Sequence, residues 1–189
     1  CELWMRESLR VMKPTASFYI WGAVGAISDS IIHQKLMLDK LGFTFRDWIT
    51  WQKRRGRGNV RGWLYTREEV LWYVKDNAQY IWNVDAQYGD EPNQFKVGMG
   101  GYAVKSEFKR ITNVWTDIPE QLTGKDTLHY TPKPQPALER IIQAHTQSGD
   151  LVLDFFSGSG STGIAAQALN RRCILVDSDE QSYLETKAR

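Results

Sequence analysis

The sequence predicts an α/β domain built on a doubly wound, mostly parallel sheet. Helix and strand patterns alternate at both ends of the chain, and a buried strand at 151–154 runs directly into a glycine-rich loop. A helix of small residues follows that loop, as in sheets that bind ligands at the carboxyl ends of their strands. A length of 189 residues suits one domain with its own core, so we expect a single domain over residues 1–189.

The first elements follow from apolar spacing and from the residues that end helices. Residues 2–12 predict a helix, which Pro14 ends because the residue before proline avoids the helical region. The segment ASFYIW at 16–21 is rich in aromatic and branched residues and predicts a buried strand. A second helix should run to residue 41 and end at Gly42.

The middle of the chain predicts strands and one long irregular segment. Residues 43–51 form a strand, and a basic loop, KRRGRGNVRG, follows it. Residues 70–74 and 80–82 predict a hairpin that turns at Asp76-Asn77. Residues 84–132 are polar and rich in Gly, Asn and Asp, and so long an irregular stretch is usually functional.

The last third alternates helix and strand. Pro136 suits the first turn of a helix that runs to about Gln147. The elements expected after it are a buried strand at 151–154, a loop at 155–161, a helix at 162–169, a strand at 173–176 and a helix from Asp179.

Composition excludes several classes of protein. The hydrophobic fraction of 42% and the charged fraction of 24% are those of an ordinary globule, and no apolar run approaches a membrane span. The charged N-terminus does not resemble a signal peptide. Cys1 and Cys173 lie far apart and predict neither a disulfide framework nor a metal cluster, so a reducing cytoplasm is the expected location.

Basic and aromatic residues concentrate in the first half of the chain. Seven of the eight tryptophans precede residue 83. Between Trp51 and Trp63 the loop carries five cations, Lys53, Arg54, Arg55, Arg57 and Arg61. Cations bind phosphates and indoles stack on bases, so Trp63 and these five residues are candidates for contact with a nucleic acid. The alternative is that this loop is a solvated basic turn and that its two flanking tryptophans pack in the core. We expect the tryptophans outside the loop to be core residues. His33 and His145 should be structural or exposed.

The strongest signal is LVLDFFSGSGSTGIAAQAL, a strand that ends in Asp154 and leads through glycines into a helix. Glycines let backbone amides approach a ligand, and the helix N-terminus favours electronegative groups. Taken alone, the glycine spacing and Asp177 also fit a dinucleotide site. Against that reading, Asp154 can accept hydrogen bonds from a cationic amine, for which a pyrophosphate site has no use. Only residues 178–189 remain for the rest of such a domain. A turn without any ligand is the remaining alternative, and Asp177 could instead cap a helix.

The segment HYTPKPQPALERIIQAHTQSGDLVLDFFSGSGSTGIAAQALNRRCILVDSD resembles adjoining motifs X, I and II of amino-group DNA methyltransferases of the β group. The resemblance implies the Rossmann-like fold of S-adenosylmethionine-dependent methyltransferases, with S-adenosylmethionine as cofactor. By position it assigns motif X to His129, Thr131, Lys133 and Pro134. It assigns motif I to Asp154, Phe156, Ser157, Gly158, Ser159, Gly160 and Ser161, and the ribose-binding acid to Asp177.

The sequence departs from the family pattern at four positions. Tyr130 stands for the usual proline, Pro132 for glutamine, Phe155 for proline and Ser161 for threonine. Pro132 and Phe155 bear on the geometry of the loops and so on cofactor affinity.

The resemblance continues upstream and divides the domain into three subregions. LRVMKPTASFYIWG, WITWQKRRGRGNVRGWLYTREEVLWYVK and ITNVWTDIPE are similar to segments that follow the catalytic loop in this family. The implied subregions are a catalytic-side part at 1–83, a target-recognition insertion at 84–128 and a cofactor-binding part at 129–189.

The family tetrapeptide Asp/Asn/Ser-Pro-Pro-Tyr/Phe, motif IV, holds the amino group of a flipped base, and this sequence contains no Pro-Pro. We therefore expect a domain incomplete at its N-terminus, and the catalytic residues stay unknown. The implied activity is methyl transfer to an exocyclic amine of double-stranded DNA, with adenine N6 preferred over cytosine N4.

Three other functions stay open. The chain could be a catalytically incompetent fragment that only binds cofactor or DNA, an RNA methyltransferase, or, more distantly, a nicotinamide oxidoreductase. A homodimer and a cognate restriction endonuclease are compatible with the sequence, a membrane partner is not expected, and no metal site is assigned.

Overall fold

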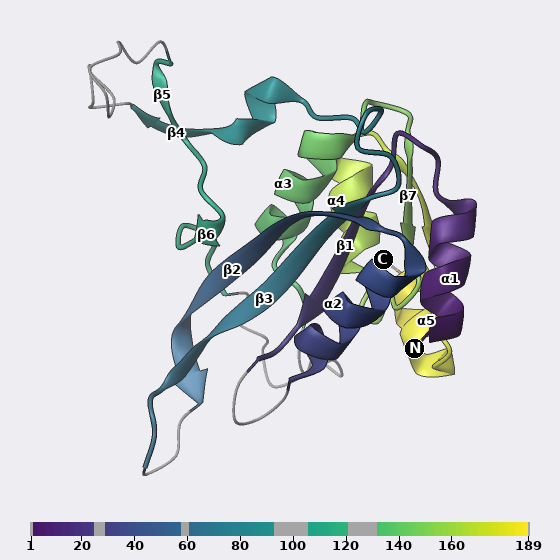
Figure 1. Cartoon of the computed structure of the whole chain (residues 1–189), viewed down its shortest axis with the longest axis horizontal. Helices are drawn as coiled ribbons and strands as arrows, with labels where there is room; N and C mark the ends of the chain where they lie inside the picture. The colour runs from purple at the N-terminus through teal and green to yellow at the C-terminus, as the bar shows by residue number, and fades with distance from the viewer. Residues whose placement is uncertain (1, 25–28, 58–60, 93–105, 121–131, 189) are drawn as a thin grey trace.

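The computed structural model describes residues 2–24, 29–57, 61–92, 106–120 and 132–188, which form three sheets and several helices (Figure 1). The larger sheet has four strands in the order β1-β3-β2-β6. Their bounds are β1 Ser17–Gly22, β2 Thr44–Arg57, β3 Tyr65–Val74 and β6 Val114–Trp115. Because β3 is antiparallel to both β1 and β2 while β6 is parallel to β2, three of the four strands run the same way. The α/β class with a mainly parallel sheet is thereby confirmed.

The C-terminal part contains a strand–helix–strand unit. β7 (Leu151–Asp154) pairs in parallel with β8 (Arg172–Leu175), and α4 (Ser161–Ala168) connects them, as parallel strands require. The chain then ends in α5 (Glu180–Ala188). Within the described ranges, no helix has the length and apolar character needed to cross a membrane.

Helices cover both faces of the larger sheet. Alternate residues of β3 point to opposite sides of the sheet, and because they are apolar on both sides, both faces need to be covered. Leu71 and Tyr73 pack with α1 (Glu2–Val11) and α2 (Ser30–Leu41). Val70, Trp72 and Val74 pack on the other side in a core that includes Ala137 of α3 (Gln135–His145). The sheet therefore separates the N-terminal helices from α3, which in turn packs against α4 (Figure 1).

The first half of the basic segment, residues 53–57, is a strand rather than the expected loop. β2 continues through residue 57, because β3 begins at Tyr65 and provides a partner as far as the Arg57–Tyr65 pair. The hairpin expected from 70–74 and 80–82 is wrong: the ladder partners of β3 are β1 and β2, and residues 80–82 are not a strand.

Residues 84–120 contain short elements where an irregular segment was expected. A 3₁₀ turn, η1 (Val84–Gln87), leads into β4 (Tyr88–Pro92), which pairs antiparallel with β5 (Phe108–Arg110). This pair extends away from the main sheet as an arm (Figure 1).

The strand at 151–154 is not buried as expected. Leu151 and Leu153 are exposed, and so is Ile174 on the neighbouring β8. Val152 is partly buried against the Leu138 and Ala165 cluster between α3 and α4. Among the described residues, only one face of this two-stranded sheet is covered.

His145 is the buried centre of a polar network on the α3 side of the sheet. Its Nδ1 lies 2.8 Å from the carbonyl oxygen of Ile81, which can only accept, so Nδ1 carries the proton. Its Nε2 therefore accepts the hydroxyl proton of Tyr19 at 2.7 Å. Burial lowers the pKa of His145 to about 4, despite the opposing effect of the Ile81 carbonyl. His145 is thus structural and neutral at physiological pH.

This burial predicts that the protein loses stability below neutral pH. The unfolded chain protonates His145 near its ordinary pKa of 6.5, whereas the folded chain does so only near 4. Protons therefore bind the unfolded state more strongly in this window. We expect the free energy of unfolding to fall by up to about 3 kcal/mol between these pH values. Urea unfolding at a series of pH values measures this fall in the free energy of unfolding.

Two substitutions isolate the contribution of His145. His33 is exposed, so His33→Gln should leave the fall unchanged, whereas His145→Gln should flatten it. A parent whose stability does not change between pH 6.5 and 4.5 would show that His145 protonates without unfolding.

Candidate functional site

The loop after β7 depends on glycine. Gly160 adopts φ +77° directly before the first residue of α4, and Gly158 adopts φ +48°. A Cβ at residue 160 would lie 2.9 Å from Oγ1 of Thr186 in α5. Glycine is therefore required at 160 both by the left-handed backbone and by the contact with α5. The loop thus leads directly into α4, whose first two residues, Ser161 and Thr162, line the depression described below.

Asp154, at the end of β7, fastens this loop. Its Oδ1 accepts a hydrogen bond from the backbone amide of Phe156 at 3.0 Å, and its Oδ2 accepts one from the Thr162 hydroxyl at 2.6 Å. Each carboxylate oxygen can accept more than one hydrogen bond, so acceptor capacity remains for a ligand. The residue is half-buried, which strengthens an interaction with a cation.

Asp177, after β8, also reaches the loop. Its Oδ2 accepts a hydrogen bond from the Gly158 amide at 2.7 Å. The alternative role as the cap of the last helix belongs instead to Asp179, whose Oδ2 accepts the Ser182 amide of α5. Asp154 therefore holds the two flanks of the glycine loop, and Asp177 holds its middle.

A depression of about 280 Å³ lies beside the loop, where segments far apart in sequence meet. Of the residues expected to bind a cofactor, the structure places here Lys133, Asp154, Phe156, Ser157, Gly158, Ser159 and Ser161. Pro134 is buried directly before α3, and neither it, Gly160 nor Asp177 lines the depression. His129 and Thr131 lie outside the described residues.

Three further residues line the depression: Pro132, Leu138 and Thr162. Thr162 was missed because its role depends on the folded loop, which brings its hydroxyl back to Asp154. Leu138 lies on α3, which begins shortly after Lys133. It was missed because the apolar pattern of that helix alone predicts a core residue at this position.

Glu68 on β3 joins the depression to the basic hairpin. Its carboxylate forms an ion pair with Lys133 at 2.7 Å and a second one with Lys53 on β2. Both ammonium groups also lie over indoles, Lys133 over Trp21 at 5.2 Å and Lys53 over Trp51 at 5.5 Å. Burial acts to raise the pKa of Glu68, but the two lysines outweigh it and hold this pKa below its ordinary value. Lys53 and Lys133 are therefore partly neutralised by one shared carboxylate.

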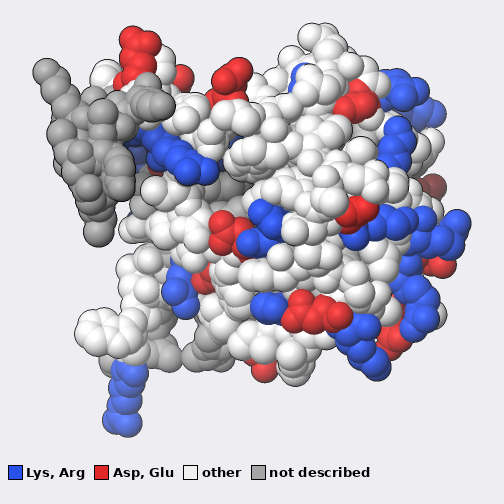
Figure 2. Space-filling view, turned by 45° about the horizontal axis from the view of Figure 1, so that its top comes forward, with Lys and Arg blue, Asp and Glu red and all other residues white. Residues whose placement is uncertain are grey.

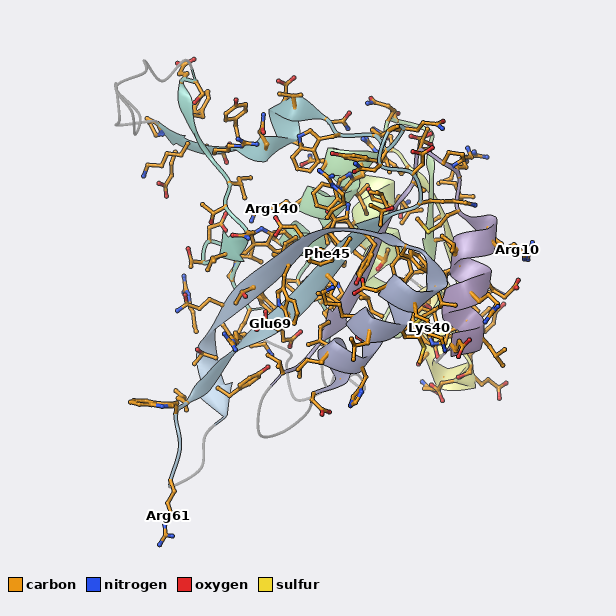
Figure 3. All side chains as sticks on the ribbon, in the orientation of Figure 1. Arg10, Lys40, Phe45, Arg61, Glu69 and Arg140 are labelled. Carbon is orange, nitrogen blue, oxygen red and sulfur yellow. The ribbon has the colours of Figure 1, made fainter. Side chains whose placement is uncertain are left out.

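The candidate DNA-binding residues divide into exposed and buried ones. Trp63 is 98% exposed and Arg54 is exposed, and Arg61 lies at the tip of the β2–β3 hairpin (Figure 3). Trp51 is only 4% exposed, and its Nε1 donates to the carbonyl oxygen of Ile118 at 3.0 Å. Stacking of a base on Trp51 is therefore excluded. The side chains of Arg55 and Arg57 lie outside the described part of the chain.

Charge on the face drawn in Figure 2 is mixed: lysines and arginines alternate with acids and form no continuous basic surface. Among the described residues, this face therefore offers no extended basic patch that would attract a polyanion strongly.

The depression fits the amine-bearing end of an elongated ligand. It offers the carboxylate of Asp154, the serine hydroxyls of the loop and the amides at the start of α4. Its volume is near the lower end of the roughly 300–1,000 Å³ that is typical of small-molecule sites. Part of a larger ligand can therefore occupy it.

Comparisons with known proteins agree with this geometry. The sequence model of a family described as DNA methylase, for N6 and N4 methyltransferases, matches residues 1–188. The chain is 30% identical over 185 residues to the type II methyltransferase M.HpaI of Haemophilus parainfluenzae, covering 96% of this chain and 55% of that protein. It is 34% identical over 190 residues to M2.DpnII of Streptococcus pneumoniae, covering 96% and 62%. The chain thus spans less than two thirds of the length of these relatives.

Solved structures give the same fold. The M1.HpyAVI–SAM complex superposes with a TM-score of 0.73 at 25% identity, over 99% of this chain and 80% of that one. The PvuII cytosine-N4-specific DNA methyltransferase also gives 0.73, at 16% identity, over 97% of this chain and 67% of that one. The methyltransferase fold expected from the sequence is thereby confirmed.

Proposed function

Because this chain belongs to the N6/N4 DNA methylase family, we propose that it acts in transferring a methyl group from S-adenosylmethionine to an exocyclic amino group of double-stranded DNA. Adenine N6 is proposed ahead of cytosine N4 as the acceptor. The single observation that carries the proposal is that Asp154, the glycine loop and Lys133 meet in one depression, which Glu68 ties to the exposed basic hairpin.

Each part of the site has a proposed role. Asp154 accepts hydrogen bonds from the amine of the cofactor's methionine moiety, and the loop amides and serines position the rest of that moiety. Asp177, which already holds Gly158, binds the ribose hydroxyls. When bound, the cofactor supplies an activated methyl group on a positively charged sulfur, and the protein contributes binding and orientation.

The DNA side of the proposal rests on the hairpin and on residues 84–128. Arg54, Arg61 and Trp63 contact the duplex, and the β4–β5 arm belongs to the target-recognition subregion. Lys53 contributes less than the arginines because it is paired with Glu68. We assign no residue of this chain to the role of holding the amino group of the target base during methyl transfer.

The test is transfer of a labelled methyl group from S-adenosylmethionine to unmethylated DNA, followed by nucleoside analysis. N6-methyladenine is the expected product. If N4-methylcytosine is found instead, the chain is a DNA methyltransferase whose acceptor is cytosine rather than adenine. A chain that binds cofactor and DNA yet transfers nothing would favour the binding module. Label in RNA in preference to DNA would point to an RNA methyltransferase.

Trp63 gives a specific prediction for DNA binding. Trp63→Ala should weaken duplex binding about tenfold or more, since an aromatic stack on a base contributes roughly 1–3 kcal/mol. Leu64→Ala is the matched control, because Leu64 is the next residue and is also exposed. Fluorescence anisotropy with a labelled duplex measures both. Equal affinities of the two variants would remove Trp63 from the interface.

The relatives named above are type II methyltransferases, so a cognate restriction endonuclease is the proposed genetic partner. We also propose that the chain forms a homodimer, and sedimentation measures its oligomeric state.

A further inference from the structure

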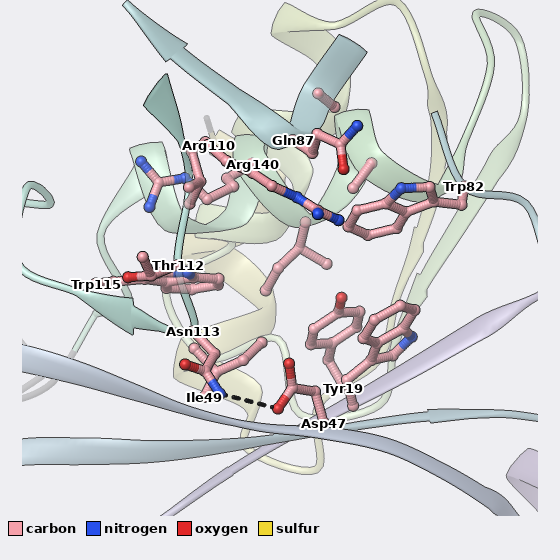
Figure 4. Close-up of a pocket in the computed structure, with 15 residues that line it drawn as sticks. Tyr19, Asp47, Ile49, Trp82, Gln87, Arg110, Thr112, Asn113, Trp115 and Arg140 are labelled. Atoms are coloured by element: carbon pink, nitrogen blue, oxygen red, sulfur yellow. Dashed lines mark hydrogen bonds between the residues drawn. The ribbon is translucent and has the colours of Figure 1, made fainter. Parts of the chain in front are cut away.

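A second cavity, of about 200 Å³, lies on the α3 side of the sheet beneath the β4–β5 arm (Figure 4). It shares no lining residue with the depression beside the glycine loop. Its walls come from β1, β2, β3, α3 and the segment 110–115. None of the roles proposed above uses it.

Two hydrogen-bond acceptors face into this cavity. Oδ1 of Asp47 accepts the Trp48 amide at 2.8 Å and the Asn113 amide group at 3.1 Å. The other carboxylate oxygen points toward the interior in Figure 4, and within the described ranges no donor to it is recorded. The Tyr19 hydroxyl also points inward, and because its proton goes to His145, its oxygen is left to accept. A ligand that binds at this end should therefore present hydrogen-bond donors to it, such as the N–H groups of an amine.

The remaining walls are largely aromatic and apolar. The indoles of Trp72 and Trp82 and the side chain of Ile141 line the cavity. A cavity of about 150 Å³ can hold one benzene ring, so a volume of about 200 Å³ suits a single ring with substituents better than a larger ring system. Aromatic side chains and hydrogen bonds to a base edge are the common means of holding an unpaired base.

The rim carries positive charge. Arg110 and Thr112 line the cavity and are exposed, whereas Ile49 and Trp72 on the sheet side are buried. Within the described residues no acidic partner of Arg110 is recorded, while Arg140 is held by Asp117. An anion at the rim would therefore meet Arg110.

We propose that this cavity binds a single amino-bearing nucleobase of pyrimidine size, with the amino group at Asp47 and Tyr19 and the phosphate at Arg110. The exocyclic amine of cytosine can donate to the two acceptors that face this end of the cavity, Asp47 and Tyr19. Uracil places a carbonyl oxygen at the same position, where it meets the Asp47 carboxylate unfavourably. The site is independent of methyl transfer and holds whether or not the chain is active.

The experiment is calorimetric titration of the chain with cytidine 5′-monophosphate and with uridine 5′-monophosphate, each in saturating S-adenosylhomocysteine. The expected result is one-site binding of the cytidine nucleotide, at least tenfold tighter than that of the uridine nucleotide. Asp47→Asn should abolish this preference, while Asp90→Asn, an exposed acid on β4, should preserve it. Arg110→Ala should weaken the nucleotide severalfold but leave cytidine, which has no phosphate, unchanged.

Any of the following results would overturn the proposal: equal affinity for the two nucleotides, no effect of Asp47→Asn in a chain with an unchanged unfolding transition, or no saturable binding. Binding of the nucleotide only when S-adenosylhomocysteine is omitted would assign it to the cofactor depression and would also overturn the proposal. A parallel titration with oligodeoxycytidylate distinguishes the two sources from which such a base could come, a DNA strand and a free nucleotide. Asp47-dependent binding of the oligonucleotide tighter than that of the mononucleotide identifies a DNA strand, and the reverse identifies a free nucleotide.

Discussion

Asp154→Asn should weaken the binding of S-adenosylhomocysteine about 10- to 100-fold while the chain stays folded. A hydrogen bond to a charged group contributes about 1.5–3 kcal/mol, and the asparagine lacks the charge that attracts the cofactor's cationic amine. Its amide oxygen can still accept from Phe156 and its amide nitrogen can donate to Thr162, so the loop should survive. Isothermal calorimetry gives the ratio of dissociation constants.

Asp150→Asn is the matched control. Asp150 directly precedes β7 and accepts the Gln147 amide, but it does not line the depression. Its substitution should leave cofactor affinity within about twofold. If both variants bind like the parent, Asp154 only organises the loop and does not contact the cofactor.

Trp51→Ala should cost about 3–5 kcal/mol of unfolding free energy, the typical result of truncating a buried aromatic side chain. The ring is almost fully buried and packs edge-on against Trp21 at 6.1 Å. Its loss also breaks the hydrogen bond to Ile118. Chemical denaturation followed by circular dichroism measures the change.

Trp63→Ala provides the comparison, since the two indoles flank the same basic segment. Because Trp63 is exposed, its removal should change stability by less than about 0.5 kcal/mol. A loss of stability in Trp63→Ala similar to that in Trp51→Ala would contradict the division of this segment into a buried and an exposed end.

The sequence identified the parts of the fold that local chemistry specifies. Gly42 ends α2 in the left-handed conformation, at φ +90°, as a C-terminal glycine should. Asp154, the glycine loop and α4 follow one another in the chain, so their geometry depends on neighbours that the sequence displays. The same holds for Pro136 in the first turn of α3.

What the sequence did not predict depends on partners distant along the chain. β2 continues through its basic residues because β3 pairs with it, and Trp82 stacks on Trp72 instead of forming a strand. The pairing of Glu68 with Lys53 and Lys133 requires two elements to meet that are 65 residues apart. The inward acceptors of Asp47 and Tyr19 likewise arise only when β1 and β2 share one sheet face with α3.

The central claim is that the glycine loop holds S-adenosylmethionine and not a dinucleotide. The measurement that tests it most directly is calorimetric titration of the unmodified chain with S-adenosylhomocysteine, repeated in excess NADH. The account predicts saturable one-site binding that NADH does not displace. Displacement by NADH, or a folded chain that releases no heat of binding, would contradict it.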